Sequence, residues 1–165
     1  MLKSLYTILL LISFALPALA TTPEMLCQQI AEREYPNDLR MRNYVYSKQL
    51  KAYYDMQGIP NNEIKQIAEN EYPNDYSMQQ YVYNKQEASF RYMETVGDME
   101  VKQIALNDYP RDYSMQQYVY DKQFAAKQFM SRVDKNDAVI KAINEYPNDY
   151  SMQQYVYNQA MSGRQ

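Results

Sequence analysis

A Tyr-Pro pair recurs in this chain at intervals of 37 residues. It stands at Tyr35-Pro36, Tyr72-Pro73, Tyr109-Pro110 and Tyr146-Pro147. The surrounding blocks read EYPNDLRMRNYVY, EYPNDYSMQQYVY, DYPRDYSMQQYVY and EYPNDYSMQQYVY. A fixed period of this length is typical of a repeat architecture, in which one supersecondary unit is stacked several times. The sequence therefore predicts four units, at about residues 23–60, 61–97, 98–134 and 135–163.

Each unit has the pattern of a short helix, a Tyr-Pro turn and a longer helix. In the second unit Ile64, Ile67 and Ala68 share one side of the short helix. Proline ends this helix because it has no N–H and disfavours helical geometry in the residue before it. The aspartate two residues after each proline is expected to cap the long helix; these are Asp38, Asp75, Asp112 and Asp149. The expected caps of the short helices are Thr22, Asn61 or Asn62, Asp98 and Asn136.

The long helices carry a seam of apolar and small residues at helical spacing. In the first unit the seam is Val45, Gln49, Ala52, Met56 and Ile59. The second unit has Val82, Gln86, Ser89, Met93 and Val96 at these positions, and the third has Val119, Gln123, Ala126, Met130 and Val133. Two tyrosines per unit flank the seam, one on either side: Tyr44 and Tyr46, Tyr81 and Tyr83, Tyr118 and Tyr120, Tyr155 and Tyr157. So wide an apolar arc suits a helix that is covered on two sides.

We therefore predict an all-α fold of four tandem 37-residue helix-turn-helix repeats. The units stack either as a small open α-solenoid or as a closed bundle of hairpins. Neither Gly nor Pro occurs in Ser131–Asp137, so the sequence leaves open whether the third long helix continues into the fourth unit. The last long helix is expected to end near Gly163.

The first twenty residues have the features of a secretory signal peptide. Lys3 is followed by the apolar stretch Leu5–Leu16, and Ala18-Leu19-Ala20 has the small-x-small pattern of a cleavage site. We expect cleavage after Ala20, a secreted or periplasmic location, and a single helical repeat domain over residues 21–165. An uncleaved N-terminal anchor is the alternative. After cleavage, no apolar stretch is long enough to span a membrane.

Charge and residue types exclude several classes of function. The net charge of −3 becomes −4 when Lys3 is removed, so the chain lacks the basic character that nucleic-acid binding requires. The sequence has no histidine, which removes the commonest general base and metal ligand. Cys27, the one cysteine, aligns with the apolar residues Ile64 and Val101 and is expected to be buried. We predict no catalytic residue, no metal site and no cofactor.

Two other patterns are open to a chemical interpretation. The carboxylates Glu71 and Asp75, repeated in each unit, are the groups that a hydrolase or a calcium site uses, but helix capping explains the aspartate. The 11 methionines suit Cu(I), but Met at helical spacing is normally core.

The tyrosines leave the function undecided between packing and binding. The chain has 19 tyrosines and no tryptophan, and tyrosine is enriched at interfaces because it combines a rigid apolar ring with a polar tip. We predict a non-enzymatic interaction protein that binds a protein, a peptide or an envelope polymer through the eight flanking tyrosines. The alternative is a carrier of a small ligand or of copper or calcium, using Tyr, Met and Asp side chains. The sequence does not indicate an oligomeric state.

Overall fold

The computed structural model describes residues 21–163, and in this range all regular secondary structure is helical. The helices are α1 (Pro23–Glu34), α2 (Leu39–Gln57), α3 (Glu63–Glu71), α4 (Tyr76–Thr95), α5 (Met99–Asp108), α6 (Tyr113–Met130), α7 (Asp137–Glu145) and α8 (Tyr150–Ser162). The predicted all-α fold is confirmed. The predicted signal peptide, residues 1–20, lies outside the described residues. Among residues 21–163, no helix is both long and apolar enough to cross a membrane.

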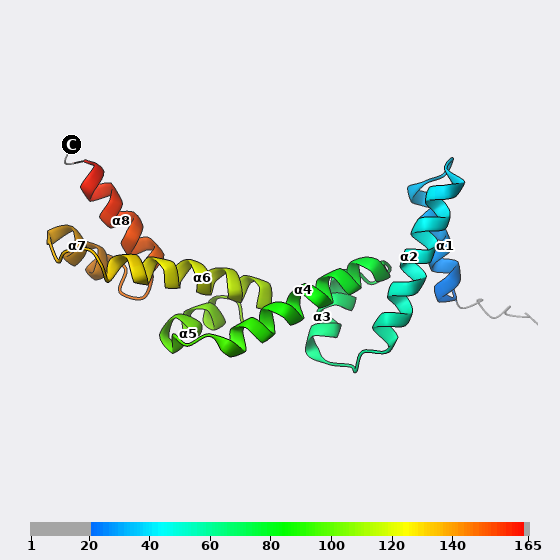
Figure 1. Ribbon diagram of the computed structural model, residues 1–165, viewed down its shortest axis with the longest axis horizontal. Coiled ribbons are helices and arrows are strands. Elements are labelled where there is room, and N and C mark those ends of the chain that lie inside the picture. Colours follow the sequence, from blue (N-terminus) through cyan, green and yellow to red (C-terminus); the bar gives the residue numbers. More distant parts are fainter. Residues whose placement is uncertain (1–20, 164–165) are drawn as a thin grey trace, which may run out of the picture.

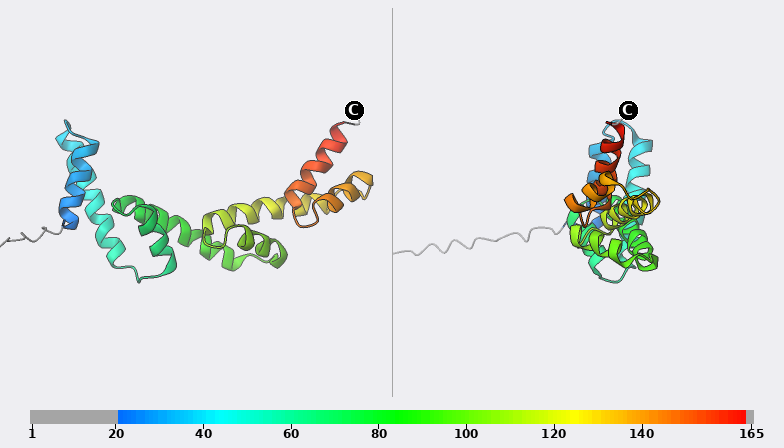
Figure 2. Two further views of the ribbon diagram at one scale, coloured as in Figure 1. Left: turned by 180° about the vertical axis from the view of Figure 1, so that it is seen from behind. Right: turned by 90° about the vertical axis from the view of Figure 1, so that its left-hand side faces the viewer.

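The helices pair into four hairpins that follow one another along a shallow arc (Figure 1). Hairpins 1 to 4 consist of α1/α2, α3/α4, α5/α6 and α7/α8, and each long helix also contacts the long helix of the next hairpin. Hairpins 1 and 4 stand at opposite ends of the arc, and the reverse view shows the same extended shape (Figure 2). The hairpins therefore form an open solenoid and do not close into a bundle.

The helix ends follow the capping pattern of the sequence. Thr22, Asn62, Asp98 and Asn136 cap the short helices, and Asp38, Asp75, Asp112 and Asp149 cap the long ones. In α4, for example, Asp75 Oδ1 accepts a hydrogen bond of 3.0 Å from the Met78 N–H. The boundary that the sequence left open is a true break, because α6 ends at Met130 and Asn136 caps a separate α7.

Small side chains allow the helices of a hairpin to approach closely. The alanine four residues before each Tyr-Pro pair is fully buried in every hairpin, at Ala31, Ala68, Ala105 and Ala142. Cys27 is also fully buried, as the sequence predicts. The core is divided into separate clusters, of which one joins Met56 of α2 to Ile64, Val82 and Tyr83 of hairpin 2. A second cluster joins Met93 of α4 to hairpin 3 in the same way, so hairpins 2 and 3 each complete their interior with a methionine of the preceding hairpin.

A buried glutamine joins each hairpin to the next. Gln49 of α2 is 2 % exposed; its amide nitrogen donates to Asp75 Oδ1 at 2.7 Å, and its amide oxygen accepts from the Ser77 N–H at 3.1 Å. Gln86 bonds Asp112 and Ser114 in the same way, and Gln123 bonds Asp149 and Ser151. We call this three-residue contact the glutamine clamp. It satisfies both ends of a buried amide, which explains why a polar residue occupies an otherwise apolar seam.

An aromatic contact accompanies the clamp at every junction. The first residue of the receiving long helix is a tyrosine whose ring meets a side chain of the preceding long helix. The ring centroids of Tyr53 and Tyr76 are 4.9 Å apart, and those of Phe90 and Tyr113 are 5.2 Å apart. At the last junction a cation takes this place, with Lys127 Nζ 5.2 Å from the centroid of the Tyr150 ring.

The residues that build these contacts change at the two ends of the solenoid. Leu39 replaces the junction tyrosine in hairpin 1, where no described hairpin precedes it, and is 65 % exposed. In hairpin 4 the clamp position holds Ala160. Both ends therefore lack a residue that stacking of a further hairpin uses.

The glutamine clamp is expected to contribute to the free energy of unfolding. Gln86→Ala removes one of the two donors to Asp112 Oδ1, leaves the Ser114 N–H without its partner, and is expected to lower the free energy of unfolding by about 1–3 kcal/mol. Urea denaturation followed by circular dichroism measures the loss. Gln103→Ala is the control, because Gln103 is exposed and bonds only Asn107 within α5. Equal stability of the two variants would contradict the clamp.

Candidate functional site

The eight tyrosines predicted as a binding face divide into two sets. Tyr44, Tyr81, Tyr118 and Tyr155 are 60, 60, 58 and 56 % exposed. On the other flank of the seam Tyr83 and Tyr120 are only 7 and 4 % exposed, and Tyr46 and Tyr157 are half-buried. Tyr83 and Tyr120 therefore cannot belong to an exposed face. Tyr46 packs against the core cluster of hairpin 1 and Tyr157 against Phe129, so the candidate surface narrows to the first set. We call these four residues the tyrosine row.

The division follows from helix geometry and from the contacts of the buried set. Two positions along a helix correspond to a rotation of about 200°, so Tyr81 and Tyr83 point to different sides of α4. Tyr83 packs in the cluster that joins hairpins 1 and 2. Tyr120 stacks on Phe124 at 5.7 Å between ring centroids, and its hydroxyl accepts a hydrogen bond of 3.4 Å from the Asp98 N–H. One flank is thus required for packing, whereas the other faces outward.

Each tyrosine of the row has the same neighbours on its own helix. A half-buried methionine precedes it by three positions, and in the first three hairpins an exposed lysine follows it by four positions. The sets are Met41, Tyr44 and Lys48; Met78, Tyr81 and Lys85; Met115, Tyr118 and Lys122; and Met152, Tyr155 and Gln159. Residues spaced by three and four positions share one helix face, so the three side chains form one surface strip.

Two grooves connect the strip across the helix junctions. A groove of about 560 Å³ lies between α4 and α6, where Lys85 faces Met115 and Tyr118. A second groove, of about 240 Å³, lies between α6 and α8 and is lined by Tyr118, Lys122 and Met152. Tyr118 lines both. The row is therefore continuous with concave surface on either side of hairpin 3.

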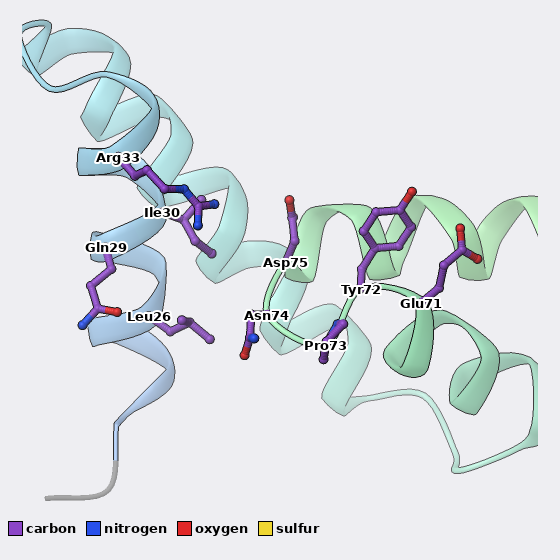
Figure 3. Close-up of a pocket in the computed structure, with 9 residues that line it drawn as sticks. All are labelled: Leu26, Gln29, Ile30, Arg33, Glu71, Tyr72, Pro73, Asn74 and Asp75. Carbon is purple, nitrogen blue, oxygen red and sulfur yellow. The ribbon is translucent and has the colours of Figure 1, made fainter.

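A separate pocket lies between α1 and the turn that precedes α4 (Figure 3). Its volume is about 420 Å³; α1 contributes Leu26, Gln29, Ile30 and Arg33, the end of α3 contributes Glu71, and the turn contributes residues 72–75. An equivalent pocket of about 310 Å³ lies between α5 and the turn before α8, with Ile104 in the place of Ile30. The lining of the first pocket mixes the apolar Leu26, Ile30 and Pro73 with polar and charged groups such as Gln29, Arg33 and Asp75.

The repeated aspartate of the turn acts as a helix cap. Partial burial opposes ionisation of Asp75, but hydrogen bonds from the Gln49 amide, the Met78 N–H and Ser77 outweigh it and lower the pKa of this carboxyl below its ordinary value of 3.8. A carboxyl with a lowered pKa is a poor general acid at neutral pH. The residue that the sequence offered as a candidate hydrolase group is thus engaged in folding.

The groups considered for metal binding do not converge in the described chain. Met56 and Met93 are 1 % exposed and belong to different core clusters. Within residues 21–163, no three His, Cys, Asp or Glu side chains come together as a metal site. Burial raises the pKa of the Cys27 thiol, which keeps it protonated and unreactive.

Sequence reasoning did not identify the glutamine clamp or the lysines beside the tyrosine row. The signal for the clamp was a polar residue repeated inside an apolar seam, at Gln49, Gln86 and Gln123. The signal for the strip was the Met-x-x-Tyr-x-x-x-Lys spacing, which becomes informative once the tyrosine is known to be exposed. The chain matches no protein-family model, no curated protein and no solved structure.

The lowered pKa of Asp75 predicts acid sensitivity of the second hairpin. A folded-state pKa below the unfolded value gives stability that is present above pH 3.8 and is lost as the pH falls through the folded value. Asp75→Asn keeps a capping oxygen but cannot titrate. Between about pH 5 and about pH 3 the wild type should therefore lose more unfolding free energy than this variant, as measured by urea titration at each pH. Asp134→Asn, at an exposed position between α6 and α7, should behave as the wild type does.

Proposed function

We propose that this chain is an exported, non-enzymatic interaction protein that binds a protein, a peptide or an envelope polymer through the tyrosine row. The observation that carries the proposal is the nearly equal exposure of Tyr44, Tyr81, Tyr118 and Tyr155, which lies between 56 and 60 %. Export is inferred from the signal-like residues 1–20, and a location outside the cytoplasm agrees with an envelope partner.

The block that precedes the tyrosine of the row differs in hairpin 1, whereas the tyrosine itself is the same. Leu39, Arg40, Arg42 and Asn43 replace the Tyr, Ser, Gln and Gln found at these positions in the other hairpins. Tyr44 is retained next to these changes, although its side chain is 60 % exposed. An exposed ring contributes little to a core, so packing gives no strong reason to keep it. Retention of an exposed tyrosine in a changed block supports a role in binding.

The physical chemistry of tyrosine suits this role. A tyrosine that becomes buried on binding contributes a large apolar area, loses few rotatable bonds and keeps a hydrogen-bonding hydroxyl. Four such residues on successive hairpins offer a partner several equivalent contacts. An elongated partner benefits most, because each further contact is made at high effective concentration.

The test is replacement of the whole row. The variant with Tyr44, Tyr81, Tyr118 and Tyr155 all changed to Ala should lose capture of its partner from the native cell envelope, with mass spectrometry as the readout. Truncation of a hot-spot tyrosine costs about 2 kcal/mol, so Tyr118→Ala alone should weaken binding about 30-fold. Helicity and melting temperature should stay close to those of the wild type.

A matched variant controls for the loss of exposed apolar side chains. Leu39, Met99, Ile140 and Ile143 are between 45 and 66 % exposed and lie outside the row. Their replacement by Ala should leave capture intact. Unimpaired capture by the row variant, or equal losses in both variants, would contradict the proposal.

A small-ligand or metal carrier is the second candidate, and the pocket of Figure 3 is the observation that favours it. Its volume is within the range of sites for small molecules. This function predicts that Cu(I), calcium or a simple glycan raises the melting temperature. A ligand at a concentration of about one hundred times its Kd adds about 2.7 kcal/mol to the free energy of unfolding. Arg33→Ala should reduce the shift if the ligand occupies this pocket. A melting temperature that none of these ligands changes would count against a carrier.

A further inference from the structure

We infer that the partner of the tyrosine row is an acidic peptide segment with apolar side chains at intervals. This inference rests on the proposed function and names the chemistry of the partner. It comes from what surrounds the row: an exposed lysine after three of its tyrosines, a methionine before each of them, and the grooves between the long helices.

The lysines of the strip differ from the other lysines of the long helices. Lys51 pairs with Asp55 at 2.6 Å, and Lys127 pairs with Asp98 at 2.8 Å. Lys48, Lys85 and Lys122 are exposed, and none of them forms an ion pair within 4.0 Å in the part of the chain that the structure describes. Each of these ammonium groups can therefore meet a carboxylate of a partner without first breaking a contact of its own.

The cations are set in an otherwise acidic chain. The net charge is −3 and the isoelectric point is near 5.0. An acidic partner is therefore repelled by most of the surface and attracted where cations are concentrated, which favours one binding register. Three carboxylates line the two grooves: Asp121 accepts a hydrogen bond from the Tyr92 hydroxyl, Asp149 accepts one from the Gln123 amide, and Asp108 lies exposed in the groove between α6 and α8. The groove between α4 and α6, where Asp121 is the one carboxylate of the lining, is therefore the better place for a carboxylate of the partner.

The grooves require apolar side chains from the partner. The groove between α4 and α6 combines the exposed Lys85 with Ala88, the half-buried Met115 and the ring of Tyr118. A methionine side chain adapts its shape and packs favourably against apolar groups. A peptide can place a leucine-like side chain in this space and a carboxylate beside the lysine. An acidic glycan supplies the carboxylates but no apolar side chain to fill the groove.

The test uses mature protein and short labelled peptides of defined composition. The first probe is a Glu-Glu-Leu repeat peptide, and the comparison probes are the Lys-Lys-Leu and Gln-Gln-Leu repeats and the acidic glycan polygalacturonate. Fluorescence anisotropy at low and high ionic strength measures binding. We expect Glu-Glu-Leu to bind most tightly and to weaken as salt is added, because charges on an exposed surface are screened.

Charge reversal locates the site on the strip. The variant with Lys48, Lys85 and Lys122 changed to Glu should lose at least about 30-fold in affinity for Glu-Glu-Leu and should gain affinity for Lys-Lys-Leu. The control variant changes Arg132, Lys135 and Lys141 to Glu, which alters the net charge equally at exposed positions outside the strip. It should bind as the wild type does. Circular dichroism checks that both variants remain helical.

The outcomes separate this inference from the proposed function. If the lysine variant still captures from the envelope the partner that the tyrosine-row variant loses, the row binds but its partner is not acidic, and the inference fails alone. Preferential binding of polygalacturonate would also overturn it in favour of a glycan. If neither variant affects capture, both the row and the acidic partner are rejected.

Discussion

The structure depends on an aspartate that serves two helices at once. In α4, Asp75 Oδ1 accepts the Met78 N–H of its own helix and the Gln49 amide of the preceding hairpin. The same carboxylate oxygen thus caps its own helix and holds the preceding hairpin against it. Because the amide of Gln49 is buried, stacking of the two hairpins in a shifted register leaves buried polar groups of both hairpins without partners. Stacking in one register is the arrangement that satisfies all of them.

This register also determines where the tyrosine row lies. Each tyrosine of the row follows the capping aspartate by six residues, as Tyr81 follows Asp75. In hairpins 2 to 4 the cap fixes the first residue of the long helix and the clamp fixes the rotation of this helix against the preceding one, so its sixth residue faces the same side each time. The nearly equal exposures of Tyr81, Tyr118 and Tyr155 are the result, and Tyr44 of hairpin 1 has the same exposure as Tyr81. Folding and the proposed binding thus use neighbouring residues of one short sequence block without competing for the same side chains.

The sequence predicted the helices and their caps because these depend on local chemistry, as at Asp75 and Asn136. It did not separate Tyr81 from Tyr83, because both flank the seam symmetrically and only the crossing of α2, α4 and α3 decides which flank is covered. For the same reason it left the open solenoid and the closed bundle as alternatives. The lysines of the strip were beyond sequence reasoning as well, since an exposed lysine is informative only when the absence of a carboxylate beside it is known.

The open arc has a consequence for how the row can act. Within residues 21–163 the extensive contacts between helices join each hairpin only to its neighbours, so the separation of successive tyrosines is set at each junction and not by a common core. A partner that follows the long helices gains one tyrosine, and in three hairpins one lysine, each time it crosses a junction. Single contacts of this kind are weak, but their linkage in one chain raises the affinity steeply with length. Hairpin 4 has Gln159 in the lysine position and Ala160 in the clamp position, so the cationic strip and the stacking signal end together.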